Sequence, residues 1–123
     1  VVSAVRLYDE GILPGPLRMN LVFGVPGGID ASPEALDAML RPLPSDAFWT
    51  VTCVGRPHDR VLALGLLRGA DGVRTGLEDV AYISKGVHAP SNDALVAKLV
   101  GLSKTLGREV ATIEQSRDLL GLS

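Results

Sequence analysis

Residues 72–79 read Gly72-Val73-Arg74-Thr75-Gly76-Leu77-Glu78-Asp79, a short apolar alternation that ends in two adjacent acids. Within it Val73, Thr75 and Leu77 alternate with Arg74 and Gly76, which is typical of a short buried strand. An apolar run at residues 61–67 precedes the segment and predicts a helix that ends near Gly69. Residues 72–77 are therefore predicted to be a strand, with Glu78 and Asp79 at its C-terminal end.

The place of the two acids indicates a functional site. In parallel α/β folds the C-terminal strand edge binds ligands, because βα loops and helix N-termini meet there. Neighbouring carboxylates repel each other, so they are stable at this edge mainly if a metal ion, an arginine or a shared proton offsets the repulsion. Arg74 and Glu78 are separated by an even number of residues and share one strand face, whereas Asp79 begins on the other. A solvated Glu-Asp pair in an ordinary loop is the alternative.

The composition is that of one globular domain. The 123 residues are 46% hydrophobic and 21% charged. A net charge of -2 without a basic run argues against a nucleic-acid partner. No apolar run reaches the roughly 20 residues of a membrane helix, so no membrane partner is expected. Cys53 is the single cysteine, which excludes an internal disulfide and a Cys-based zinc site, and a cytoplasmic location is expected.

The predicted helices and strands alternate along the chain. Helices are predicted at residues 1–10, 32–40, 61–67 and 91–106, and strands at 17–23, 48–54 and 72–77. A loop is predicted at 80–90, and a short last helix after a capping box of Thr112 and Gln115. Alternation implies parallel strands, and a (β/α)8 barrel needs about 250 residues, so the chain supplies about three of the eight units. It begins at Val1 inside a helix-like stretch, so a fragment is expected.

Two other strand ends carry candidate binding groups. The loop Gly-Val-Pro-Gly-Gly at 24–28 can offer backbone N–H groups to an anion. Its spacing matches neither the dinucleotide nor the P-loop fingerprint, and a plain βα turn is the alternative. The strand at 48–54 leads into Gly-Arg-Pro-His, where Arg56 is a candidate ligand for a carboxylate or phosphate. His58 is either a base or simply the start of a helix.

Several motifs together resemble one enzyme family. They are Gly-Val-Pro-Gly-Gly at 24–28, Val-Gly-Arg at 54–56, Arg-Thr-Gly-Leu-Glu-Asp at 74–79, Ser-Asn at 91–92 and Gly-Arg-Glu-Val-Ala-Thr at 107–112. This set resembles the β-keto acid cleavage enzymes, also called 3-keto-5-aminohexanoate cleavage enzyme-like proteins. The resemblance implies that residues 1–123 are the C-terminal part of a single TIM-barrel domain: its last three βα units and a helical tail, without the N-terminal units.

The resemblance also implies a reaction and a set of site residues. The family uses a divalent metal, usually zinc, to condense a β-keto acid with acetyl-CoA, which yields acetoacetate and a new acyl-CoA. By resemblance, Glu78 is the zinc ligand, Asp79 the neighbouring acid/base residue and Arg74 the arginine that orients the catalytic carboxyl groups. Zinc would act as a Lewis acid while a carboxylate moves the α-proton. Arg56 is predicted to face the substrate carboxylate or the CoA phosphates.

The chain also departs from the family pattern. In the family, the other zinc ligands resemble a His-x-His pair from an early strand. In this chain His58 and His88 are thirty residues apart, and neither forms such a pair. An early Glu and the Ser and Thr residues of the family site are missing, and Val80 stands where Asn is common. These departures predict weak or no zinc retention and no activity for this piece alone. Open sheet edges predict association, so a homo-oligomer is expected.

Two other functions stay open at this stage. One is a barrel lyase that binds Mg²⁺ at Glu78 and Asp79 and holds a carboxylate with Arg56. The metal would distinguish it, since Mg²⁺ prefers oxygen ligands and water whereas zinc with two His ligands is nearly tetrahedral. The other is a non-catalytic half-barrel that acts as an assembly or binding module, with its sheet edges closed by another chain.

Overall fold

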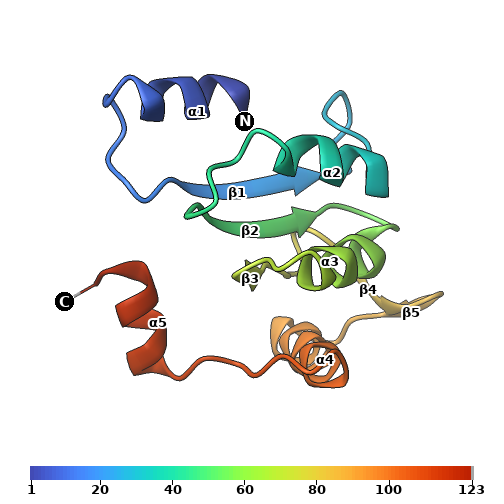
Figure 1. Ribbon diagram of the computed structural model, residues 1–123. Helices are drawn as coiled ribbons and strands as arrows, with labels where there is room; N and C mark the ends of the chain where they lie inside the picture. The colour runs from blue at the N-terminus through green and yellow to red at the C-terminus, as the bar shows by residue number, and fades with distance from the viewer. Residues whose placement is uncertain (123) are drawn as a thin grey trace.

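The computed structural model describes residues 1–122 and has an open α/β architecture (Figure 1). Its parallel sheet has the strand order β1-β2-β3, formed by β1 (Arg18–Phe23), β2 (Phe48–Cys53) and β3 (Gly72–Val73). The helices are α1 (Val2–Asp9), α2 (Pro33–Leu40), α3 (His58–Leu67), α4 (Asn92–Thr105) and α5 (Ile113–Leu120). A separate antiparallel pair consists of β4 (Tyr82–Ser84) and β5 (Val87–His88). The mixed α/β class and the parallel strands are as predicted, and they are compatible with part of an α/β barrel.

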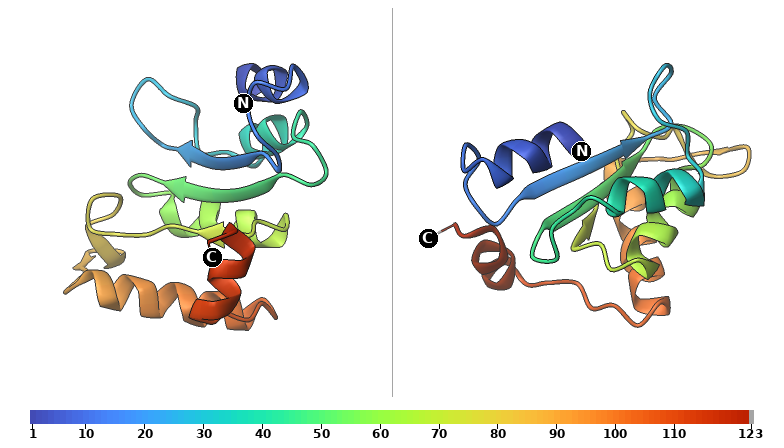
Figure 2. Two further views of the ribbon diagram at one scale, coloured as in Figure 1. Left: turned by 90° about the vertical axis from the view of Figure 1, so that its left-hand side faces the viewer. Right: turned by 45° about the horizontal axis from the view of Figure 1, so that its top comes forward.

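One face of the sheet forms the core. Leu21 of β1 is in register with Val51 of β2, and both side chains have 0% exposure. Leu36 of α2 and Leu62 of α3 belong to the same buried cluster. These helices therefore cover this face, while α1 lies beside β1 and α4 lies beyond β3 (Figures 1 and 2). Burial of this apolar layer supplies the main stabilisation of the fold.

The other face of the sheet is polar. Asn20 of β1 lies between two threonines of β2, and its Oδ1 accepts hydrogen bonds from the hydroxyls of Thr50 at 3.1 Å and Thr52 at 3.0 Å. These residues alternate in sequence with the core residues, because successive side chains of a strand point to opposite faces. The sheet thus has helices on one face and hydrogen-bonding groups on the other.

Local capping signals account for the helix starts. The side chains of Ser32 and Ser91 accept hydrogen bonds from the N–H groups of Ala35 and Ala94, both at 3.1 Å. Thr112 and Gln115 form the predicted reciprocal capping box of α5. Each bond satisfies a backbone donor that has no partner within its own helix. The predicted starts of α2, α4 and α5 are therefore confirmed.

The strand predicted over residues 72–77 is shorter than expected. β3 ends at Val73, and the N–H of Arg74 makes a last bond to the carbonyl of Val51 at 3.0 Å. The chain then leaves the sheet, and the N–H groups of Asp79 and Val80 both donate to the carbonyl of Gly76 at 3.0 Å. Within residues 1–122 β3 pairs with β2 alone. After Val73 the backbone therefore forms a turn and does not extend the strand at this sheet edge.

The predicted loop at 80–90 contains a hairpin instead. β4 and β5 are joined by Lys85 and Gly86, and Gly86 has a φ of 78°. The rings of Tyr82 and His88 lie across the two strands with centroids 4.4 Å apart. A turn with glycine at its positive-φ position between two short β-prone runs is a hairpin signal, and it was present in the sequence.

Among residues 1–122, no helix has the length and hydrophobicity to cross a membrane.

Gly65 sets the distance between α3 and β2. A Cβ atom added there would lie 2.3 Å from Cγ1 of Val51, whereas a Cβ added at Gly101 in α4 would meet nothing within 4 Å. We expect Gly65→Ala to lower the free energy of unfolding by about 1–3 kcal/mol, because overpacking outweighs the helix propensity of alanine. Gly101→Ala, the matched control, should raise it by up to about 1 kcal/mol. Urea unfolding followed by circular dichroism measures both.

The double variant Gly65→Ala/Val51→Ala should lose less stability than the sum of the losses in the two single variants, because the smaller side chain at position 51 makes room for the added methyl group. Equal effects of Gly65→Ala and Gly101→Ala would contradict the close approach of α3 to β2.

Candidate active site

Arg74 draws the two acids together directly after β3. Its Nη2 atom contacts Oε1 of Glu78 and lies 3.6 Å from Oδ1 of Asp79. The Asp79 side chain is 6% exposed, and that of Glu78 is 69% exposed. Arg74 therefore offsets the repulsion between adjacent carboxylates. The burial of Asp79 argues against the alternative of a fully solvated pair, and three of the four predicted site residues lie together.

The turn that carries the acids is held by neighbouring elements. The N–H of Leu77 donates to Oδ1 of Asn92, the first residue of α4, at 2.8 Å. The carbonyl of Asp79 accepts a hydrogen bond from the N–H of Gly55 at 2.8 Å. Ser91 caps α4, which leaves the Asn92 side chain available for this turn. Both bonds lie near the C-terminal end of β2, where parallel α/β folds place their ligands.

One carboxylate oxygen at this turn could accept a further hydrogen bond. Oδ2 of Asp79 is buried and has no hydrogen-bond partner within residues 1–122. A buried carboxylate oxygen without a donor costs free energy, so a hydrogen-bond donor or a cation would stabilise it. The oxygen is therefore able to accept a hydrogen bond from a bound molecule.

Glu78 fits the role of a single metal ligand. Its carboxylate is exposed beside the buried Asp79, and carboxylate oxygens bind divalent cations such as zinc. Among residues 1–122, no three His, Cys, Asp or Glu side chains form a group that could hold a metal ion. The Glu78 carboxylate could therefore supply one ligand to a divalent cation.

Arg56 lies in the turn after β2, one residue from the Gly55 bond to Asp79. Its side chain is exposed, and it makes no ion pair within the described part of the chain. Arg56 is thus the sequence neighbour of the residue that bonds to the acid turn, and its guanidinium makes no ion pair with Glu78 or Asp79 in the described residues. Substrate binding by Arg56 stays a prediction.

His58 is the first residue of α3, as the helix-start interpretation predicts. It is 2% exposed, and its Nδ1 lies 3.0 Å from Oδ1 of Asp59. Sequence reasoning missed that Asp59 also binds Lys98 of α4, at 2.5 Å. The signal for this contact was weak, because the two residues lie far apart in sequence.

The glycine loop at 24–28 is a turn. Gly24 and Gly27 adopt φ angles of 75° and 79°, and the N–H of Gly28 donates to the carbonyl of Val25 at 2.9 Å. The N–H of Gly24 donates to the carbonyl of Ile29 at 3.2 Å. With two of its amides bonded internally, the loop supports the βα-turn interpretation over anion binding.

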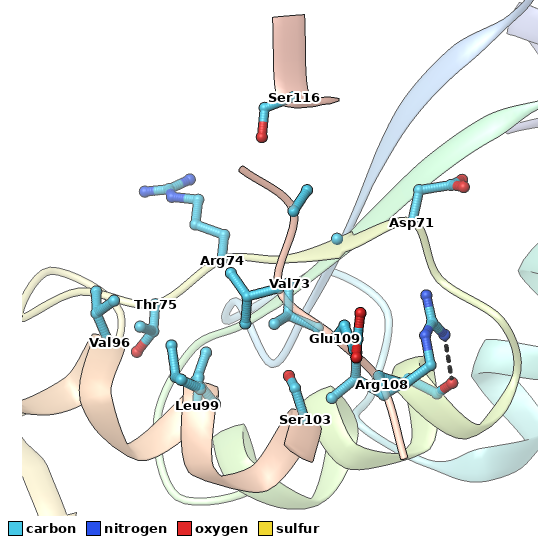
Figure 3. A pocket seen from close by; sticks show the side chains of 15 residues that line it. Asp71, Val73, Arg74, Thr75, Val96, Leu99, Ser103, Arg108, Glu109 and Ser116 are labelled. Carbon is cyan, nitrogen blue, oxygen red and sulfur yellow. Dashed lines mark hydrogen bonds between the residues drawn. The ribbon is translucent and has the colours of Figure 1, made fainter. Parts of the chain in front are cut away.

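A hollow of about 540 Å³ lies beside β3, between that strand, α4 and residues 108–116 (Figure 3). Val73 and Thr75 point toward Leu99 of α4, whereas Arg74 points away from them (Figure 3). Arg108 lines the hollow, but its guanidinium donates to the carbonyls of Leu66 and Ala70 at 3.1 and 2.9 Å. The hollow therefore has an apolar floor, and Arg108 is occupied in closing the C-terminal end of α3.

Comparison with known proteins identifies relatives of this chain. A family model described as beta-keto acid cleavage enzyme matches residues 1–122. The chain is 42% identical over 120 residues to a 3-keto-5-aminohexanoate cleavage enzyme of Acetoanaerobium sticklandii, covering 98% of this chain and 44% of the relative. It is 37% identical over 125 residues to a 3-oxoadipate:acetyl-CoA acetyltransferase of Cupriavidus necator, covering 99% of this chain and 44% of the relative. It thus spans less than half the length of these curated relatives.

The reactivity of the Cys53 thiol tests whether the end of β2 is buried. Its side chain has 0% exposure, and burial, with a smaller contribution from the charge of Asp79, raises its pKa to about 11. We expect alkylation by iodoacetamide at pH 8 to be slow in the folded protein and fast in urea, because the thiolate is the nucleophile. Mass spectrometry measures the rate. In the control Cys53→Ala/Ser3→Cys, the thiol moves to an exposed position on α1 and should react rapidly without urea. Rapid labelling of Cys53 in the folded protein would contradict its burial.

Proposed function

This chain belongs to the beta-keto acid cleavage enzyme family, and we propose that it is the C-terminal part of an enzyme that condenses a β-keto acid with acetyl-CoA. The products would be acetoacetate and a new acyl-CoA. The names of two relatives support this reaction class: one is the acetyl-CoA acetyltransferase for 3-oxoadipate, and the other, from Rhizobium meliloti, is named 3-dehydrocarnitine:acetyl-CoA trimethylamine transferase and is 32% identical over 120 residues.

The observation that carries this proposal is the contact of Arg74 with both Glu78 and Asp79. The reaction needs a group that removes a proton next to a carbonyl, and the buried Asp79, with its unpartnered Oδ2, is suited to that role. The Arg74 guanidinium lies 3.6 Å from the other oxygen, Oδ1, and we propose that this ion pair orients the carboxylate so that Oδ2 faces the substrate. We assign the proton transfer to Asp79 and its orientation to Arg74.

Glu78 is proposed as the metal ligand, because its exposed carboxylate sits beside the proposed base. A zinc ion held there, together with ligands outside this chain, would supply Lewis acidity toward the keto oxygen. Arg56 adds an exposed positive charge one residue from the backbone that contacts Asp79. We propose that it binds the substrate carboxylate or the phosphates of CoA.

We further propose that the sheet is part of a TIM barrel. Helices on one face and the Asn20, Thr50 and Thr52 network on the other support this, with the polar face turned to the barrel interior. β3 is an open edge, and the hollow beside it leaves space for further polypeptide. Since the chain spans 44% of the length of its relative, activity is expected of a complete protein in which these residues meet the remaining units. The same open edge supports association between chains.

Replacement of Glu78 tests the proposal. In the complete protein, Glu78→Gln should lower kcat for acetoacetate formation by at least about a hundredfold, the scale of losing one electrostatic group in an active site. Zinc content should also fall, because the neutral amide is a poorer ligand. Product formation from a panel of β-keto acids with acetyl-CoA is measured by mass spectrometry, and metal content by elemental analysis of the same samples.

The matched control is Glu34→Gln, which removes an exposed carboxylate from the first turn of α2. Its activity and metal content should equal those of the unmodified protein. A Glu78→Gln protein that keeps full activity and its metal would refute the assigned role. If the unmodified protein forms no acyl-CoA from any β-keto acid, the reaction itself is wrong.

A further inference from the structure

Lys98 connects three elements around the acid turn. From the middle of α4, its Nζ donates to Oδ2 of Asp59 at 2.5 Å and also to the backbone carbonyl of Ile83 in β4. Asp59 lies in the first turn of α3, and its other oxygen contacts the buried ring of His58. Lys98 thus ties β4 to the first turn of α3.

A second path leads from the same helix turn to Asp79. The N–H of His58 donates to the carbonyl of Gly55 at 3.1 Å, and the N–H of Gly55 donates to the carbonyl of Asp79 at 2.8 Å. The segment 79–83 is therefore held at both ends from the first turn of α3. The Gly55 bond holds its beginning at Asp79, and Lys98 holds its end at Ile83.

The three-stranded sheet does not hold this segment directly. β3 ends at Val73 with a last bond from the N–H of Arg74, and residues 75–80 run without strand pairing before the hairpin, where the N–H of Ala89 donates to the carbonyl of Ala81 at 2.9 Å. The position of the Asp79 carboxylate then depends on bonds within its own turn and on bonds from outside this sheet. Small displacements of a catalytic group are costly, because about 1 Å of misplacement can lower a rate about a hundredfold.

The charges of Lys98 and Asp59 suit this arrangement. Burial raises the pKa of Asp59, but hydrogen bonds from Lys98 and His58 outweigh it and hold that pKa below its usual value. Asp59 is therefore an anion at neutral pH and a strong acceptor for the ammonium group. The side chains of Asp59 and Lys98 are 48% and 32% exposed, so the pair contributes little to global stability. Its local effect, through the second bond to Ile83, is the feature that distinguishes it from an ordinary surface pair.

We propose that Lys98 and Asp59 are positioning residues that fix the segment 79–83 and, through it, the Glu78–Asp79 turn. This inference rests on the proposed function of that turn. Neither residue contacts the two acids directly, so each acts through backbone that is continuous with Asp79. Loss of either side chain should disturb the reaction more than it disturbs the fold.

The test compares variants of the complete protein. Lys98→Met keeps the apolar stem and removes both hydrogen bonds, and it should lower kcat about tenfold, the effect typical of groups that orient active-site residues. The KM for acetyl-CoA should change less than about twofold, because ground-state binding is unaffected. Lys98→Arg, which can reach both acceptors, should restore most of kcat. Hydrogen exchange measured by mass spectrometry should speed up within residues 79–83 in Lys98→Met.

The control is Arg68→Met, which breaks the ion pair between Arg68 and Asp37 at 2.9 Å, at the opposite end of α3. It should change neither kcat nor exchange within residues 79–83. If Lys98→Met does not fold, Asp59→Asn takes its place, since it removes the charge and keeps an acceptor oxygen. A loss of kcat without a loss of melting temperature in Asp59→Asn supports the proposal.

Three outcomes would overturn the positioning role: an unchanged kcat in a folded Lys98→Met protein, an unchanged kcat in Asp59→Asn, or an equal loss in Arg68→Met. Failure of the proposed function is seen separately, in an unmodified protein that converts no β-keto acid. In that case the structural part of the inference is still tested by hydrogen exchange. Faster exchange of residues 79–83 in Lys98→Met, with unchanged exchange in Arg68→Met, supports it. Unchanged exchange of residues 79–83 in Lys98→Met refutes it.

Discussion

Two carboxylates on successive residues repel each other when one of them is buried, and Arg74 is the positive group that offsets this repulsion here. It contacts Glu78 and lies 3.6 Å from Asp79, which allows Asp79 to be largely buried while Glu78 stays exposed. The two acids thus acquire different surroundings although they are adjacent. This difference permits separate roles for them, one as a buried acid/base and one as an exposed ligand.

The surrounding fold serves the same turn. Apolar burial between α2, α3 and one sheet face orients the strands, and their C-terminal ends deliver Gly55 and Arg74 to neighbouring positions. Because β3 is so short, the acid turn depends for its position on the Asn92 side chain of α4 and on the amide of Gly55 in the turn after β2. The polar sheet face, the edge of β3 that is unpaired within residues 1–122, and the share of its relatives' length that the chain spans support the proposal that the site takes its remaining groups from other polypeptide.

Features with local causes were predictable from the sequence. Ser32, Ser91 and the Thr112–Gln115 box cap their helices through neighbours three residues away, and all three predictions are confirmed. The length of the strand predicted at 72–77 was overestimated. The alternation of apolar residues indicates that a segment can form a strand, but it does not show whether a neighbouring strand is present to pair with it. The hairpin at 82–88 was missed although Gly86 marked it. The roles of Arg56, Glu78 and Asp79 rest on a family resemblance, since spacing alone left several chemistries open.

The alternation of helices and strands, the family and the grouping of Arg74, Glu78 and Asp79 could be read from the amino-acid sequence, because they follow from periodicity, from motifs and from residues four or five positions apart. The burial of Asp79, the bonds of Gly55 and Asn92 to its turn and the bridge of Lys98 between Asp59 and Ile83 could not, because they depend on the folded arrangement. Lys98 and Asp59 are 39 residues apart in the chain. Contacts at such separations arise from the packing of whole elements, which no local pattern of residues records.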